Sequence, residues 1–363
     1  MQMTTPRQDG FRMPGEFEPH ARTFMVFPHR PDNWRNNAED AQHAISDLAR
    51  EISKHEEVVM ITPRDCMHKA ISLLHDTKVK ITAFGSDDCW ARDTGATFVS
   101  NGVELRGISW DFNAWGGHYD GCYTSWNKDS KIADRMCAIS NVSTYRTEGF
   151  VLEGGSVHVD GDGTCITTEE CLLSGGRNPH LSKGDIEHML KEYLNVDKVL
   201  WLKHGIVDDE TNGHVDNMAC FARPGEVILA WTDNMTHPQY ERSRGAYEYL
   251  SSQTDAKGRP LKVHKLYIPN DMYVTQEESD GIVRSGHALP RNVGDRLCAS
   301  YVNFVMPNGA IIFPTFGDDE YDMRALETLK SIFPERVVKG FYSREILLGG
   351  GNLHCVTQQQ PLV

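Results

Sequence analysis

Apolar positions along the chain recur with two periods, and stretches of the two kinds alternate. Three stretches carry their apolar residues on one face of a 3.6-residue helix, which predicts amphipathic helices: Ala41, Ile45, Leu48 and Ile52; Ile186, Met189, Leu190 and Leu194 behind a Ser182 cap; and Leu326, Leu329 and Phe333. Short β-branched runs at residues 58–62 and 199–202 predict strands. Strands that alternate with helices indicate an α/β protein.

Five segments share one form, in which a polar or glycine-rich start precedes one or two unusual polar residues and an alternating apolar run. They cover residues 90–99, 152–159, 212–221, 300–305 and 351–356. With Asp93, Glu153, His214, Asn303 and Cys355 as markers, the intervals are 60, 61, 89 and 52 residues, close to those of structural repeats. Five such units predict a propeller that closes around an axis and brings the markers to its centre. An open parallel sheet is the alternative, and it explains the recurrence less well.

Composition narrows the classes of function. The net charge of −14 disfavours nucleic acid, whose phosphates need a basic face, and suits a cationic ligand. The sequence contains no apolar run of bilayer length, and residues 1–11 lack the apolar core of a signal peptide, so we expect a cytoplasmic protein with no membrane partner. Nine cysteines without a CxxC pair or zinc-ribbon spacing are expected to be reduced thiols. Nucleotide binding has no support, because neither a Gly-x-Gly-x-x-Gly after a strand nor a Walker A loop occurs.

A glycine run, Gly349–Gly351, comes just before one thiol, that of Cys355. Glycines permit positive φ and close approach of a ligand to the backbone, so a side chain just after them can stand in an open pocket. A free cysteine is more often buried and inert, and Cys355 alone would be interpreted in that way. Its significance depends on the other polar residues.

His214 and Asp216 stand two residues apart in a run with strand character, so we expect both side chains on one face of a strand. The pair supplies a proton carrier beside a carboxylate. A core histidine bonded to its neighbour is one alternative. A metal site is another, but the sequence has no HExxH motif and no third ligand at metal-binding spacing.

Cys355, His214, Asp93, Glu153 and Asp216 together predict covalent attack on a cationic carbon. A thiolate with an imidazole attacks electrophilic carbon, whereas the oxyanion of acyl transfer needs hydrogen-bond donors and not extra carboxylates. A guanidinium is planar, charged and matched to carboxylates in two-point fashion. Two aspartates would keep it charged and orient its central carbon toward the sulfur.

Two tryptophans are candidates for the walls of such a cation pocket. Trp90 precedes Asp93 by three residues, and Trp115 stands beside two glycines in the segment 112–117. An aromatic face over a cation contributes about 0.5–2 kcal/mol. Taken singly, each tryptophan is more often a core or rim residue.

The residues resemble those of the guanidine-modifying superfamily and, within it, the agmatine deiminases. The resemblance covers nearly the whole chain and rests on several motifs in the same order: Gly10–Pro19, Pro31–Arg35, Trp90–Asp93, Phe112–Gly117, Glu153–Gly155, Glu210–Asp216, Gly350–Cys355 and Thr357–Pro361. We see no departure from the family pattern at a catalytic position.

The resemblance implies a fivefold pseudosymmetric α/β propeller of the pentein type, a single catalytic domain over residues 1–363 built from five ββαβ-like repeats. It implies hydrolysis of agmatine to N-carbamoylputrescine and ammonia without metal ion or organic cofactor, and a homo-oligomer. Carried over by motif, the expected site contains Cys355 as the nucleophile, His214 as acid and base, Asp93 and Asp216 on the guanidinium, Glu153 as the carboxylate that orients the histidine, Trp90 and Trp115 as pocket walls, Glu210 on the distal amine, and Gly350 as a further substrate contact.

Other functions are compatible with the same residues. A deiminase of arginine or peptidyl-arginine, or an amidinotransferase, would share the thiol and the carboxylates. Arginine would need a partner for its α-carboxylate, for which Arg92, Arg244 and Arg284 are candidates. A noncatalytic polyamine-binding module would have no use for the thiol, and a metal-dependent hydrolase based on His214 and Asp216 would lack ligands.

Overall fold

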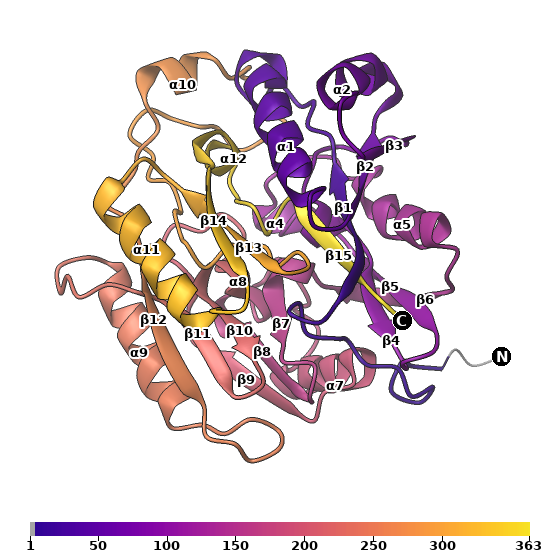
Figure 1. Ribbon diagram of the computed structural model, residues 1–363, viewed down its shortest axis with the longest axis vertical. Helices are drawn as coiled ribbons and strands as arrows, with labels where there is room; N and C mark the ends of the chain where they lie inside the picture. Colours follow the sequence, from indigo (N-terminus) through magenta and orange to yellow (C-terminus); the bar gives the residue numbers. More distant parts are fainter. Residues whose placement is uncertain (1–3) are drawn as a thin grey trace.

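The computed structural model describes residues 4–363, which form five small sheets with the longer helices around them (Figure 1). In spatial order the strands are β15 (Thr357–Pro361), β1 (His20–Val26), β2 (Glu57–Thr62) and β3 (Lys80–Ala83) in the first sheet; β4 (Thr97–Ser100), β5 (Leu105–Asp111) and β6 (Thr144–Val151) in the second; β7 (Val157–Val159), β8 (Thr164–Thr168) and β9 (Lys198–Leu202) in the third; β10 (Ala219–Arg223), β11 (Glu226–Trp231) and β12 (Lys262–Tyr267) in the fourth; and β13 (Ala310–Thr315) and β14 (Val337–Tyr342) in the fifth. This arrangement replaces the alternative of one open parallel sheet.

The sheets share a pairing pattern. In four of those formed by residues 4–363, an antiparallel pair is followed by a parallel pair: β15–β1–β2, β4–β5–β6, β7–β8–β9 and β10–β11–β12. In the fifth, β13 pairs in parallel with β14, and an isolated antiparallel bridge from Val305 to Ile312 takes the place of the first strand. Figure 1 shows the C-terminal strand β15 beside the N-terminal strand β1, so the two ends of the chain share one sheet.

The longer helices connect the parallel strands, because a parallel pair requires a crossover. They are α1 (Glu39–Ile52), α2 (Met67–Leu74), α5 (Ile132–Ser140), α7 (Lys183–Leu194), α9 (Gln239–Ser251) and α11 (Asp319–Ile332). Three of them confirm the predicted helices, and Ser182 caps α7 by accepting from the Asp185 N–H. The predicted strands 58–62 and 199–202 lie in β2 and β9.

Short helices and 3-10 turns lie between the longer elements, and one of them, at residues 215–218, replaces part of a predicted strand. The short helices are α3 (Ala91–Thr94), α4 (Gly117–Asp120), α6 (Glu169–Leu172), α8 (Val215–Met218), α10 (Gln276–Asp280) and α12 (Arg344–Leu348), with 3-10 turns η1 (Asn36–Ala38), η2 (Arg64–Cys66), η3 (Asp129–Lys131) and η4 (Gly154–Ser156). Helices α3 and α8, and the turn η4, each come just before the first strand of a sheet.

The prediction that His214 and Asp216 share a strand face is wrong. His214 is the N-cap of α8, Asp216 lies inside that helix, and the strand begins only at Ala219. The chain turns because Asn212 and Gly213 have φ of 62° and 77°. The buried pair Val215 and Met218 has a spacing of three, which fits a helical turn and not the alternation of a strand. The prediction extended the strand that begins at Ala219 too far toward the N-terminus.

The chain buries three clusters of apolar side chains. One surrounds α1 and the first sheet, a second lies between β10–β13 and α11, and a third lies between β5–β9 and α7. The turn η4 contacts both α3 and α8. Among the helices of residues 4–363, none is long and apolar enough to cross a membrane.

Candidate active site

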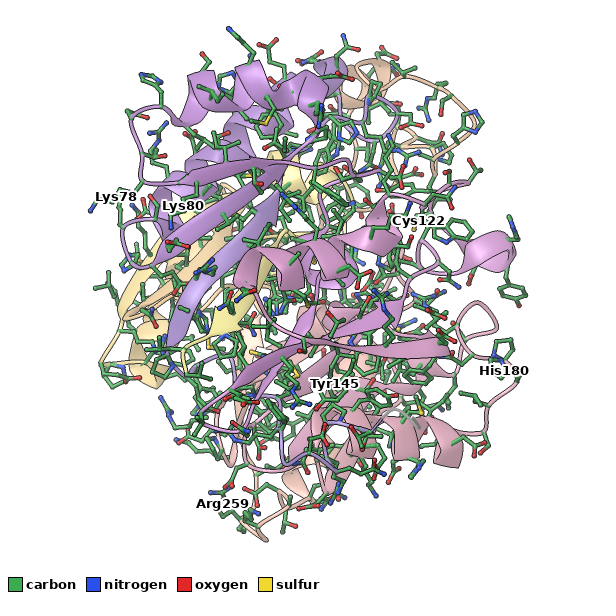
Figure 2. The ribbon with its side chains drawn as sticks, turned by 90° about the vertical axis from the view of Figure 1, so that its right-hand side faces the viewer. Lys78, Lys80, Cys122, Tyr145, His180 and Arg259 are labelled. Atoms are coloured by element: carbon green, nitrogen blue, oxygen red, sulfur yellow. The ribbon has the colours of Figure 1, made fainter. Side chains whose placement is uncertain are left out.

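An open cavity of about 440 Å³ lies at the turns that precede the strands. Its lining includes most of the site residues expected from the sequence: Trp90, Asp93, Trp115, Glu210, His214, Gly350 and Cys355. Within the described chain, Asp216 and Glu153 are not part of the lining and lie buried behind it. Cys122, which was not predicted and is labelled in Figure 2, is buried and also lines the cavity.

The thiol of Cys355 faces polar partners from two other segments. The side-chain amide of Asn303 donates to Sγ at 3.2 Å, and the thiol is 3.6 Å from Oδ2 of Asp216. The glycines before it are required by space, since a methyl group at Gly351 would lie 2.5 Å from the Trp90 ring. Gly350 has φ of 108°, which an L side chain rarely adopts. The glycine run therefore lets the thiol reach the cavity wall beside an aromatic ring.

Asp93, His214 and Asp216 converge on the backbone at Gly155. A methyl group on Gly155 would lie 2.6 Å from Nδ1 of His214, 2.9 Å from Oδ1 of Asp93 and 3.0 Å from Oδ2 of Asp216. Asp93 accepts hydrogen bonds from the Gly155 N–H at 2.8 Å and from the Trp115 indole N–H at 2.9 Å. Only glycine leaves room for this convergence.

His214 lies between two carboxylates at a distance too long for a hydrogen bond. Its Nδ1 is 3.8 Å from Oδ2 of Asp93, and its Nε2 is 3.8 Å from Oε2 of Glu153. Nε2 of His214 and Oε2 of Glu153 are both buried without a hydrogen-bond partner among residues 4–363. The other oxygen of Glu153 accepts from Nε of Arg177 at 3.0 Å. The interaction of His214 with Glu153 is therefore electrostatic in this conformation.

Burial and neighbouring charges shift the ionisation of the three central groups. Burial, reinforced by Asp216 and Glu153 and opposed by His214, raises the pKa of Asp93 to about 6. Burial would lower the pKa of His214, but Asp93, Cys171 and Glu153 together outweigh it and raise that pKa well above its ordinary value. Burial and the charges of Asp216 and Asp93 raise the pKa of the Cys355 thiol. A neutral thiol therefore stands near a protonated imidazole.

Aromatic side chains hold the walls of the cavity in place. The Trp90 indole N–H donates to the Tyr123 hydroxyl at 2.9 Å, and that hydroxyl donates to Asp88 at 2.5 Å. Trp34 stacks on Trp90 with ring centroids 5.4 Å apart, and Trp115 meets Tyr123 edge to face at the same separation. Asp88 and Tyr123 were not predicted, because neither stands within a recognisable motif.

At another part of the wall, Glu210 forms an ion pair with Arg291. The same guanidinium donates to the carbonyl of Gly349 at 2.7 Å and to Oδ1 of Asn33 at 3.1 Å. Arg291 lines the cavity, whereas the arginines considered from the sequence are outside its lining in the described residues: Arg92 is buried behind it, Arg244 pairs with Glu241 and Glu248 on α9, and Arg284 contacts Ser279.

A family model described as Porphyromonas-type peptidyl-arginine deiminase matches residues 12–361. The chain belongs to this deiminase family. It is 50% identical over 359 residues to the agmatine deiminase of Pseudomonas aeruginosa strain LESB58, with 99% of this chain and 97% of the relative covered. The agmatine deiminase of Ectopseudomonas mendocina gives the same identity and coverage. A solved structure of agmatine deiminase of Enterococcus faecalis superposes with a TM-score of 0.96 at 47% identity, covering 99% of this chain and 98% of that one.

Two buried groups in this deiminase-family chain offer three metal-ligating atoms each: Glu16, His158 and His354, and Glu153, Cys171 and His214. An arginine already stands beside each carboxylate. Nη2 of Arg92 is 3.8 Å from Glu16, and Nε of Arg177 is 3.0 Å from Glu153. These guanidinium groups supply the positive charge that a metal ion would bring, so the donor sets fit a metal poorly.

Proposed function

We propose that this protein is an agmatine deiminase, which hydrolyses agmatine to N-carbamoylputrescine and ammonia. The main support is structural: the Cys355 thiol, the Asp93 carboxylate and the His214 imidazole line one cavity. The carboxylate of Asp216 lies against the sulfur. The relatives named agmatine deiminase, at about half identity over nearly the full length, support the same activity.

In the proposed complex, the guanidinium of agmatine lies between Asp93 and Asp216. Asp93 lines the cavity, and Oδ1 of Asp216 is buried without a hydrogen-bond partner in the described chain, which leaves it available to a guanidinium N–H. Carboxylates on its nitrogens keep the group charged and direct its central carbon toward Sγ of Cys355. Trp90 and Trp115 flank the cation with their rings.

The first half of the reaction forms a covalent intermediate. As the cation binds, the thiol proton passes from Cys355 to the solvent, and Sγ adds to the guanidinium carbon to give a tetrahedral adduct. Protonated His214 then gives its proton to the departing nitrogen, which leaves as ammonia. The product of this half is an amidino-thioether on Cys355.

The second half releases the enzyme. Water adds to the amidino carbon while His214, now neutral, takes a proton from it. The second tetrahedral adduct collapses: the carbon–sulfur bond breaks, the proton of the new hydroxyl passes to the sulfur and restores the thiol, and N-carbamoylputrescine leaves with its new oxygen. Glu153 stabilises the protonated form of His214 across 3.8 Å at both stages.

Glu210 is proposed to bind the distal ammonium of agmatine. In the free protein this carboxylate pairs with Arg291, so the ammonium must replace or share that guanidinium. Arg291 also supplies the specific observation for a second candidate, an arginine deiminase, because its guanidinium could receive an α-carboxylate. Agmatine is favoured because Glu210 stands beside Arg291 and would repel that carboxylate.

The repeated pairing pattern of the five sheets supports our further proposal that residues 1–363 form one catalytic domain, a fivefold α/β propeller with the cavity at its centre. Nine free cysteines are consistent with the cytoplasmic location that we propose. We also propose a homo-oligomer, as in the sequence-based expectation.

A substrate panel tests the proposed activity. Agmatine, arginine and an N-acyl-arginine amide are assayed for both ammonia and the ureido product, whose equal release distinguishes hydrolysis from amidino transfer. We expect kcat/KM for agmatine to exceed that for arginine by at least about tenfold, because one ion pair to a charged group contributes about 1.5–3 kcal/mol. The Cys355→Ser variant should turn over none of them. A preference for arginine, or no turnover of any guanidine, would refute the proposal.

The pH dependence of kcat/KM should reflect the ionisation of the Asp93 carboxyl. Its pKa is raised to about 6, so the carboxylate loses its charge as the pH falls through that value and no longer attracts a guanidinium. We expect kcat/KM for agmatine to fall about tenfold per pH unit below about 6, as one proton binds to the free enzyme. Asp93→Asn should lower kcat/KM by at least about tenfold at neutral pH and lose this limb. If kcat/KM of Asp93→Asn still falls in the same way below about pH 6, the group that titrates is not Asp93.

Glu210→Gln should discriminate between two substrates of similar length. Agmatine carries the distal ammonium and n-butylguanidine does not, so the variant should lower kcat/KM for agmatine by roughly 10–100-fold and affect n-butylguanidine far less. The comparison cancels any effect of leaving Arg291 without its partner. Glu278→Gln, which breaks a Glu–Arg pair with Arg344 outside the cavity lining, is the matched control and should affect both substrates alike. Equal losses in Glu210→Gln would show that Glu210 does not bind the amine.

A further inference from the structure

His354 precedes the proposed nucleophile in sequence, yet its side chain lies behind the cavity between two buried carboxylates. Its Nδ1 is 2.8 Å from Oδ2 of Asp216, and its Nε2 is 2.8 Å from Oε2 of Glu16. Glu16 comes from the N-terminal segment, and its other oxygen accepts from the Met306 N–H at 3.3 Å. The motif that contains Glu16, residues 10–19, has no part in the reaction as described so far.

Two carboxylates on one imidazole determine its charge. An ionised carboxylate only accepts hydrogen bonds, and imidazole donates from both nitrogens only as the imidazolium. Arg92 adds a second cation, with Nη2 3.8 Å from Oε2 of Glu16. Glu16 and Asp216 are thus balanced by His354 and Arg92, without which burial of the two anions would be costly.

The other charged and titratable groups that face this cluster are compatible with a protonated His354. Nε2 of His158 is 3.8 Å from Glu16, while its Nδ1 accepts from the Phe221 N–H, and burial lowers the pKa of His158 to about 4. On the cavity side, Asp216 faces the thiol of Cys355 and the imidazole of His214.

A comparison of Asp93 with Asp216 shows how the contact with His354 changes the pKa of a buried carboxyl. Both are buried, but Asp93 has neutral donors, the Trp115 indole and the Gly155 N–H, whereas Asp216 has His354. Burial raises the pKa of Asp93 to about 6. For Asp216, burial acts in the same direction, but the hydrogen bond and charge of His354 outweigh it and lower the pKa. For His354, burial and Arg92 act downward, and the two carboxylates raise the net pKa.

We propose that His354 and Glu16 are positioning residues for Asp216: protonated His354, anchored by Glu16, holds the Asp216 carboxylate in its charged form and in one orientation, with Oδ1 left for the guanidinium. The inference rests on the proposed function, in which Asp216 binds that group. It assigns a role to the N-terminal motif, which reaches the site through Glu16.

The charge of His354 can be measured in the resting protein without substrate. Full-length protein labelled with 15N-histidine is examined by NMR, and the His354 signals are those that disappear in His354→Gln. We expect both ring nitrogens to carry protons at pH 8 in the wild type, and a neutral ring at pH 8 in Glu16→Gln. A neutral His354 in the wild type at pH 7 would overturn the proposal, whatever the substrate proves to be.

Kinetics test the consequence for Asp216. In His354→Gln the carboxylate loses its cation beside Asp93, so the acidic limb of kcat/KM should move up by about one pH unit or more, with a loss of about tenfold at pH 6 that shrinks by pH 8.5. His158→Gln removes an equally buried histidine beside Glu16 and should leave the limb in place. If His354→Gln lowers kcat/KM equally at all pH values and the acidic fall stays at the same pH, His354 serves only in packing and the proposal is overturned.

Discussion

The balance of buried charge around Cys355 is the constraint on which the site depends. Four carboxylates, those of Glu16, Asp93, Glu153 and Asp216, lie there with Arg92, Arg177 and two histidines, and each set is almost fully removed from water. Buried charges persist only when opposite charges or hydrogen bonds offset their lost hydration. With both histidines protonated the set is neutral, and the thiol beside it is neutral too. A bound guanidinium adds one positive charge, which the ionisation of the thiol offsets, so the proposed substrate would promote formation of its own nucleophile.

The fold places these groups together through turns that precede strands. The turn η4 contacts both α3 and α8, and each of the three carries or adjoins one of the polar residues. The strands that follow them lie in separate sheets. Glycine at 155 and 351 leaves the space that the carboxylates, the imidazole and the Trp90 ring occupy. Because the side chains come from segments far apart in sequence, their mutual positions depend on the packing of the whole chain.

Part of this arrangement was accessible from the sequence. The helical stripes at residues 41–52 and 186–194 predicted α1 and α7, and the family was identified from motifs and is confirmed by the match over residues 12–361. The strand expected to carry His214 and Asp216 is a helical turn, and the strand that follows begins only at Ala219. Glu16, Arg291 and His354 were missed, because burial and pairing of a charged residue depend on partners more than fifty residues away and leave no local pattern.

The proposed mechanism requires a covalent bond between Sγ of Cys355 and the guanidinium carbon. Rapid mixing with agmatine, acid quenching and mass spectrometry of the peptide that contains Cys355 test this most directly. We expect a transient mass increase on that peptide equal to agmatine less ammonia, which decays as N-carbamoylputrescine accumulates. An unmodified Cys355 peptide at every quench time, while product forms, would contradict it.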